Sequence, residues 1–333
     1  MRIQALDLAK GFTVLMIAPI HSCMLYSLPY VRETFLGNFF AFIAEGPGAQ
    51  LFMTAMGISF TFSKHTFRSI SQRAFFLLII GYALNIFKFI IPLWLGILPK
   101  GFRNLLPDST LKIFVLGDIL QFASIALIVI FLIQRIISYQ NIAWILAAII
   151  CLISPLMWDI HKNDFFVDYT LQLVGGKPPD IYFPLFPWLV YPLTGLAIGY
   201  NLQQRPDKPI DDFKYIGCFL IIAGQFFDNG KTISFYRTYP PSTLQHIGIV
   251  LITFYVWNIF SRYVSPNYFF SFLTYMSRNI TQIYCIQWIL VCWMLPIFGY
   301  QQLDLFSSIS AMVIITACTL FVSIYINFFK DGK

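Results

Sequence analysis

Residues 9–29 read AKGFTVLMIAPIHSCMLYSLP, an apolar run that contains one lysine near its start and one histidine in its second half. A helix of about 20 apolar residues is long enough to cross the hydrocarbon core of a bilayer. Further apolar stretches recur along the whole chain. The sequence therefore predicts an all-α, polytopic transmembrane helix bundle.

The composition supports this fold class. The chain has 333 residues, of which 58% are hydrophobic and only 11% are charged, whereas about a quarter of the residues of a soluble domain are charged. The first apolar run has no small-residue cleavage site and is followed by more such runs, so we expect a retained helix and not a signal peptide. We expect one integral-membrane domain over residues 1–333.

We predict ten spans, with eleven as the alternative. The ten are residues 9–29, 37–62, 73–97, 113–134, 139–157, 183–202, 213–228, 244–262, 279–298 and 307–329. An even number puts both termini on one side. With the N-terminus inside, thirteen of the 22 basic residues fall in inner segments and eight in outer ones, so the positive-inside rule favours N-in and C-in. We expect a multi-pass protein of a bacterial inner membrane.

The net charge of +7 is then topological and does not indicate a nucleic-acid partner. The six cysteines all lie in apolar segments without C-x-x-C spacing, which favours small buried hydrophobes over disulfides or a metal site. Signatures of serine hydrolases, zinc proteases and phosphate-binding loops are missing. We expect no metal.

His21 is the main candidate for a functional residue, because ionisable side chains inside a bilayer are costly and usually functional. Lys10 lies eleven residues earlier on nearly the same helix face, about 16 Å away along the axis. Asp7 and Lys10 form an i, i+3 pair on that face. Lys10 at the inner interface is suited to hold an anionic donor group, and the imidazole to act as base or acyl acceptor.

Other polar residues interrupt later spans. Glu45 and the following Gly46-Pro47-Gly48 suggest a discontinuous second helix. Asp118 and Gln121 are one turn apart at the start of the fourth span, and Arg237 in an outer loop is a candidate anion ligand. The ninth span carries several polar residues that require an inward face, namely Arg278, Asn279, Gln282 and Gln287.

Several segments resemble one known group, the transmembrane acyltransferases of the heparan-α-glucosaminide N-acetyltransferase-like family, which is related to the acyltransferase-3 family. The opening pattern R-x-x-A-L-D-L-A-K-G-F, followed by His21, resembles the first helix of both families. The other matching stretches are LFMTAMGISFTFSK (51–64), GDILQF (117–122), FPLFPWLVYPLTGLAIG (183–199), YPPSTLQHIG (239–248) and MSRNITQIYCIQW (276–288). In the last stretch Gln287 replaces the usual histidine.

The resemblance implies transfer of an acyl group, usually acetyl, from cytoplasmic acyl-CoA to a hydroxyl or amine of an extracytoplasmic saccharide. It implies His21 as the catalytic residue and a tunnel lined by polar residues of the second, fourth and ninth spans, while the loss of the histidine at 287 leaves the ninth span's contribution open. Lys10 and Arg278 would meet the CoA phosphates, and Tyr182, Tyr236 and Trp158 the saccharide. Two alternatives remain open: a polytopic transporter of a small polar or lipid-linked sugar, and a non-catalytic relative. Direct transfer and an acyl-imidazole route also both remain open. Besides donor and acceptor, the expected partners are membrane lipids, and assembly into a homo-oligomer is left open.

Overall fold

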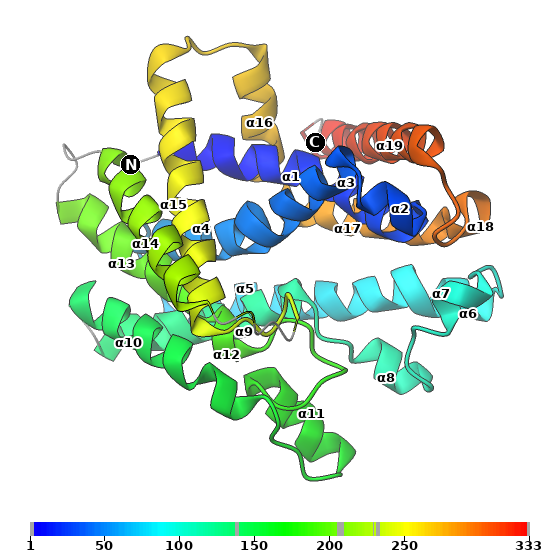
Figure 1. Ribbon diagram of the computed structural model, residues 1–333, viewed down its shortest axis with the longest axis horizontal. Helices are drawn as coiled ribbons and strands as arrows, with labels where there is room; N and C mark the ends of the chain where they lie inside the picture. Colours follow the sequence, from blue (N-terminus) through cyan, green and yellow to red (C-terminus); the bar gives the residue numbers. More distant parts are fainter. Residues whose placement is uncertain (1–2, 137–139, 205–209, 229, 231–233, 332–333) are drawn as a thin grey trace. The chain divides into compact units, whose positions relative to one another are not determined.

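The computed structural model describes residues 3–136, 140–204, 210–228, 230 and 234–331, and these are predominantly helical (Figure 1). Within these ranges there is no strand, only three isolated bridges between loop segments. Four of the described helices are long and apolar enough to cross a membrane: Gln4–Tyr26, Phe67–Trp94, Pro240–Tyr263 and Leu305–Lys330. The all-helical class is confirmed and a membrane protein is indicated, while the ten spans and the N-in/C-in topology stay predictions.

The chain divides into two compact units, and each is assembled from distant segments of the sequence. The first unit holds Met1–Leu6, Gly46–Tyr82 and Val115–Arg262, and the second holds Asp7–Glu45, Ala83–Phe114 and Tyr263–Lys333. The expectation of a single domain over residues 1–333 stays a prediction.

The helices that lie wholly or mainly in the first unit are α4 (Ala49–Thr61), α5 (Phe67–Asn85), α9 (Ile119–Ile136), α10 (Gln140–Ile153), η3 (Ser154–Met157), α11 (Phe165–Val174), α12 (Leu185–Trp188), α13 (Val190–Gln204), η4 (Ile210–Asp212), α14 (Phe213–Phe227) and α15 (Pro240–Tyr263). Those of the second unit are α1 (Gln4–Tyr26), α2 (Pro29–Arg32), α3 (Phe35–Ile43), η2 (Ile86–Ile90), α6 (Ile91–Trp94), α7 (Lys100–Arg103), α8 (Thr110–Phe114), α16 (Tyr268–Arg278), α17 (Ile280–Trp293), α18 (Leu295–Phe298) and α19 (Leu305–Asp331). The short element η1 (Ala44–Gly48) lies at the boundary between the segments of the two units.

Every predicted span coincides with at least one helix, because an apolar run in hydrocarbon must satisfy its backbone polar groups within itself. Two further helices of ten or more residues, α11 and α16, lie where the predicted spans leave loops. Both begin at a side-chain cap: Asp164 accepts from the backbone nitrogen of Val167, and Asn267 accepts from that of Phe270. Such caps satisfy the free N–H groups of a helix start.

The predicted interruption of the second span is a π-helical turn, η1, which contains Pro47 between two glycines. Proline has no N–H to donate to the preceding turn, so the regular α-helical ladder cannot continue through it. A second π-helical turn, η2, follows α5 and contains Lys88. Single π-turns inside helices are frequent at functional sites.

Close packing of α4 against α13 forms the centre of the first unit. A side chain on Gly57 would overlap the backbone oxygen of Pro192, and one on Gly195 would overlap that of Thr54. Small residues that let two backbones approach are the usual means of helix association in membranes. Gly57 therefore serves the close packing of α4 on α13.

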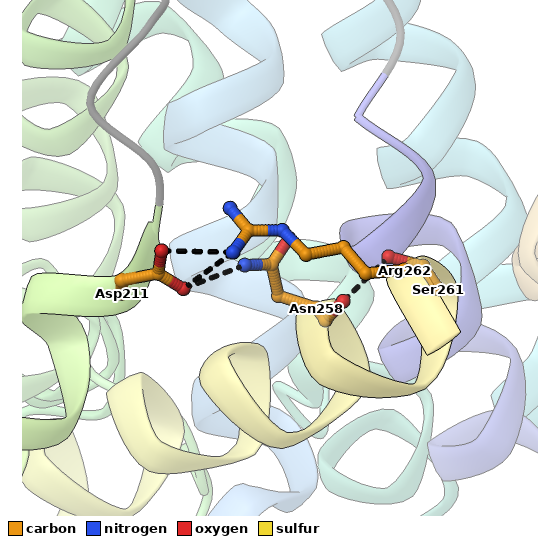
Figure 2. Close-up of polar contacts among 4 residues, drawn as sticks. All are labelled: Asp211, Asn258, Ser261 and Arg262. Carbon is orange, nitrogen blue, oxygen red and sulfur yellow. Dashed lines mark hydrogen bonds and ion pairs between the residues drawn. The ribbon is translucent and has the colours of Figure 1, made fainter. Parts of the chain in front are cut away.

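One end of the first unit is fixed by a polar contact between α15 and η4. The Nη1 atom of Arg262 lies 3.0 and 2.8 Å from the two carboxylate oxygens of Asp211 (Figure 2). Asn258, one turn earlier on α15, donates to the same carboxylate at 3.3 Å. The ion pair is about two-fifths exposed, so it contributes register and little stability. Of the connection before η4, residues 205–209 lie outside the described residues.

Candidate functional site

Helix α1 is held at both ends within the second unit, and this fixes the position of His21. Near its start, Gly11 lets the backbone of Leu273 on α16 approach so closely that any side chain there would overlap the Leu273 carbonyl. At its end, the hydroxyl of Tyr26 donates to the backbone oxygen of Val291 on α17 at 2.7 Å. The ring of His21 therefore lies against α17.

His21 contacts two successive residues of α17. Its Nδ1 atom lies 3.0 Å from Oε1 of Gln287. Its ring stacks on the indole of Trp288, with ring centroids 3.9 Å apart and an interplanar angle of 27°. Gln287 is fully buried, and His21 is partly buried. One amide and one indole thus fix both the rotation and the plane of the imidazole.

The amide of Gln287 also selects the tautomer of His21. Its Nε2 atom donates to the backbone oxygen of Tyr284 at 3.1 Å. Since a carbonyl only accepts, the amide oxygen is the atom that faces His21, and it needs an N–H on Nδ1. In a neutral imidazole the other nitrogen, Nε2, then carries the lone pair. This is the arrangement of a general base or a nucleophile.

Lys88 lies beside the same indole. Its ammonium nitrogen is 4.8 Å from the ring centroid of Trp288 and 4.7 Å from that of Phe89, and the side chain is only 3% exposed. Trp293 of α17 donates to the backbone oxygen of Phe87 at 2.8 Å, which ties η2 to α17. The π-turn thus places a buried cation against the aromatic residue that stacks on His21.

The predicted pair at the start of α1 is formed. Lys10 Nζ lies 3.1 Å from a carboxylate oxygen of Asp7, and the hydroxyl of Ser277 donates to the same Asp7 oxygen at 3.0 Å. Arg278, the next residue of α16, is exposed. Lys10 and Asp7 therefore form a small network with the end of α16, about three helical turns from His21.

Asn279 and Gln282 bind α19 and not His21. Asn327 of α19 donates to Oδ1 of Asn279 at 3.1 Å, and Gln282 donates to the backbone oxygen of Ser323 at 3.0 Å. These contacts join α17 to α19. Of the polar residues predicted on the ninth span, Gln287 is in contact with His21. Glu45 is exposed on η1.

In the first unit, Asp118 and Gln121 form a local cap at the start of α9. Asp118 Oδ1 accepts from the backbone nitrogen of Ile119 at 2.8 Å, and Gln121 Oε1 accepts from that of Asp118 at 3.1 Å. Gln121 is buried, and Gly81 of α5 packs directly on its amide. The two residues share a face as predicted, and their described contacts serve the helix terminus.

Arg237 is buried among loop carbonyls. It is 3% exposed, and its guanidinium donates to the backbone oxygen of Gly176 at 2.9 Å and to that of Ile181 at 3.5 Å. Burial lowers the pKa of Arg237 to about 10, so the side chain is still charged at neutral pH. Its contacts join the loop that carries Arg237 to the loop that contains Gly176 and Ile181.

The same loops bring two of the predicted saccharide-binding aromatics together. The rings of Tyr182 and Tyr236 lie 5.1 Å apart, and Tyr182 is 38% exposed. Burial, with the nearby Asp118 carboxylate, raises the pKa of both phenols. Trp158 lies instead against Tyr239, with ring centroids 5.0 Å apart. Tyr182 and Tyr236 thus form an aromatic pair that keeps its hydroxyl protons.

A comparison with family models identifies the chain. Residues 2–236 match the model described as heparan-α-glucosaminide N-acetyltransferase, catalytic, and this stretch covers well over half of the 333 residues. The chain belongs to this family. No curated protein matches the chain. Membership of an acetyltransferase family confirms the predicted resemblance and indicates a membrane acetyltransferase, and it gives the transporter alternative no support.

The matched stretch contains α1 with Asp7, Lys10 and His21, and it also contains Lys88. It ends before α16 and α17, so Gln287 and Trp288 lie outside it. The family match therefore covers His21 and Lys88 but not the two residues of α17 that contact the imidazole.

Two residues near His21 were missing from the predicted site. Lys88 carried a usable signal, because it is a lysine inside an apolar run. Trp288 carried none, since an apolar aromatic residue in a transmembrane helix is ordinary. Only the fold places its indole on the imidazole.

Proposed function

We propose that the protein transfers an acetyl group from cytoplasmic acetyl-CoA to an amine or hydroxyl group of a saccharide on the other side of the membrane, with His21 as the catalytic residue. The observation that carries the proposal is the bond between His21 Nδ1 and Gln287 Oε1, because it leaves the lone pair on Nε2. Membership of the acetyltransferase family supports an acetyl donor and a saccharide acceptor in general terms.

On the donor side, we assign the CoA phosphates first to Arg278. This side chain is exposed at the end of α16, and a guanidinium binds phosphate oxygens in pairs. Lys10 is expected at the same inner interface, but its ammonium group already pairs with Asp7. We therefore assign Lys10 a supporting role in donor binding.

On the acceptor side, Tyr182 and Tyr236 are the proposed platform for the saccharide, because an exposed aromatic face packs on the apolar face of a sugar ring and the phenols supply hydrogen bonds. The proposed setting is a bacterial inner membrane, with the donor in the cytoplasm. The long apolar helices support the membrane, and the basic inner segments support the orientation.

Two routes use the same imidazole. In direct transfer, Nε2 takes the proton from the attacking acceptor. In the two-step route, Nε2 itself attacks the thioester and an acyl-imidazole then passes the acetyl group on. Trapping with labelled acetyl-CoA in the absence of acceptor separates them, since only the second route leaves label on the protein.

The test is the variant His21→Ala in proteoliposomes with labelled acetyl-CoA, with glucosamine as the amine probe and glucose as the hydroxyl probe. We expect label in at least one sugar with the unmodified protein. We expect the rate to fall by roughly 10³-fold or more in the variant, since a base contributes about 10²–10⁴-fold and a nucleophile opens a separate route.

His161→Ala is the matched control, because His161 is exposed in an outer loop and bonds only to a nearby backbone oxygen among the described contacts. It should transfer acetyl groups at the unmodified rate. Full activity of His21→Ala would refute the assignment of His21. Transfer to neither sugar by the unmodified protein would refute the proposed function itself.

A further inference from the structure

Trp288 has a polar atom that its surroundings leave unused. Its indole nitrogen, Nε1, is buried and finds no hydrogen-bond acceptor among the described residues. A buried donor without an acceptor costs about 1–3 kcal/mol. Such groups are uncommon in folded proteins, and each calls for an explanation. Here the donor belongs to the ring that stacks on His21.

Trp293, on the same helix, shows what a purely structural tryptophan does here. Its Nε1 donates to the backbone oxygen of Phe87 at 2.8 Å and so fastens η2 to α17. The two indoles therefore differ in one respect. The N–H of Trp293 makes a structural hydrogen bond. The N–H of Trp288 has no acceptor among the described residues and belongs to the ring beside the proposed acetyl-transfer centre.

We propose that the indole N–H of Trp288 is an oxyanion donor, which binds the carbonyl oxygen of the acetyl group when that oxygen becomes negative. This inference rests on the proposed function. The imidazole and indole layers are separated by about one van der Waals spacing. An acetyl carbon attacked beside Nε2 of His21 would lie next to the stacked indole, and the proposal places its oxygen at the N–H edge of that ring.

The step balances without any further reactant. The acceptor's nitrogen or oxygen forms a bond to the thioester carbon while Nε2 of His21 takes its proton, and the carbonyl π electrons move to oxygen. The oxyanion accepts from Trp288 Nε1–H. When the carbonyl re-forms, the C–S bond breaks, and the departing CoA thiolate takes the proton from the imidazolium. In the acyl-imidazole route the same oxygen becomes negative in each step.

Lys88 strengthens this donor. Its ammonium lies 4.8 Å from the ring centroid of Trp288 in a buried setting. A cation over the ring draws electron density from the indole, holds it in place and makes its N–H a better donor. The positive charge also favours a negative oxygen in the same region, because water does not screen buried charges.

The test replaces the N–H alone. Incorporation of 3-benzothienylalanine at position 288 puts sulfur in place of the indole N–H and keeps the ring size and the stacking surface. We expect kcat for acetyl transfer to glucosamine or glucose to fall roughly 10²-fold, as on removal of one oxyanion donor. We expect the KM for acetyl-CoA and the melting temperature to stay close to those of the unmodified protein. Trp288→Phe, which keeps an aromatic ring without the N–H, should show a loss at least as large.

The same replacement at position 293 is the control, since it removes a bond of the fold. It should lower the melting temperature and leave kcat within about threefold of the unmodified value. A position-288 variant with kcat within threefold of the unmodified protein would overturn the inference. So would loss of thermal stabilisation by acetyl-CoA in that variant, because a group that acts on the oxyanion leaves ground-state binding unchanged. If the unmodified protein transfers no acetyl group, the proposed function fails first.

Discussion

At the scale of single residues, the centre of the candidate site is a histidine whose ring rotation and ring plane are both fixed by neighbours. Gln287 fixes the rotation of the His21 ring through Nδ1, and Trp288 fixes its plane. The sequence identified His21 from the cost of an imidazole in an apolar helix. In the sequence, Gln287 stands where the family usually has a histidine. In the fold, this glutamine is in direct contact with the imidazole.

The role of Gln287 leads to a prediction at this scale. Gln287→Leu keeps the volume and removes the acceptor of Nδ1–H, so the ring loses its preferred tautomer and orientation. We expect kcat to fall roughly 10²-fold, a loss typical of a misplaced catalytic group. Gln287→Glu restores an oxygen acceptor and should recover part of this loss. Steady-state kinetics with labelled acetyl-CoA measures both variants.

The matched control for this prediction is Gln282→Leu on the same helix. Gln282 bonds to Ser323 of α19, so its loss should lower the melting temperature and leave kcat nearly unchanged. Equal kcat values for the leucine variants at 287 and 282 would show that Gln287 has only a structural role.

At the scale of elements, close approaches of one helix backbone to another position several helices. In the first unit, α4 and α13 approach so closely that Gly57 and Gly195 each face a backbone oxygen of the other helix. In the second unit, the π-turn η2 brings Lys88 to α17, and Gly11 brings α1 to α16. These approaches need small residues or an irregular turn at one position, and the hydrophobic pattern alone does not specify them.

The packing of α4 gives the prediction at this scale. Gly57→Leu forces a side chain onto the backbone oxygen of Pro192, and backbone atoms cannot move aside as a flexible side chain can. We expect a loss of about 1–3 kcal/mol in the free energy of unfolding, or failure to fold. Thermal unfolding in detergent measures it. Ser59→Leu, at an exposed position of the same helix, should unfold within a degree or two of the unmodified protein. Equal losses at both positions would refute close packing at Gly57.

At the scale of the whole molecule, the chain belongs to an acetyltransferase family and is built of apolar helices in two compact units. Four of the described helices have the length and composition of a span. Several predicted spans consist of shorter helices separated by a turn, as where α3, η1 and α4 follow one another. Because helix lengths do not give the number of membrane crossings, a separate measurement of the topology counts them.

The predicted topology gives that measurement. Ten spans with the N-terminus inside put both termini in the cytoplasm. Tags placed at the two ends should both be accessible to a membrane-impermeant reagent only after the cells are permeabilised. Tags on opposite sides would replace ten spans by an odd number such as eleven. Two tags outside would reverse the orientation derived from the basic residues.

Sequence patterns predict the helical class, the positions of the apolar helices and the family, and they single out His21 as the candidate catalytic residue. These follow from properties of one segment at a time: hydropathy, the cost of an ionisable group in an apolar run, and motif spacing. The residues that surround that histidine are visible only in the folded chain. Gln287 and Trp288 lie more than 260 positions from His21 in the sequence, and their roles arise because the packing of α1 on α16 and α17 sets distances that no local pattern encodes.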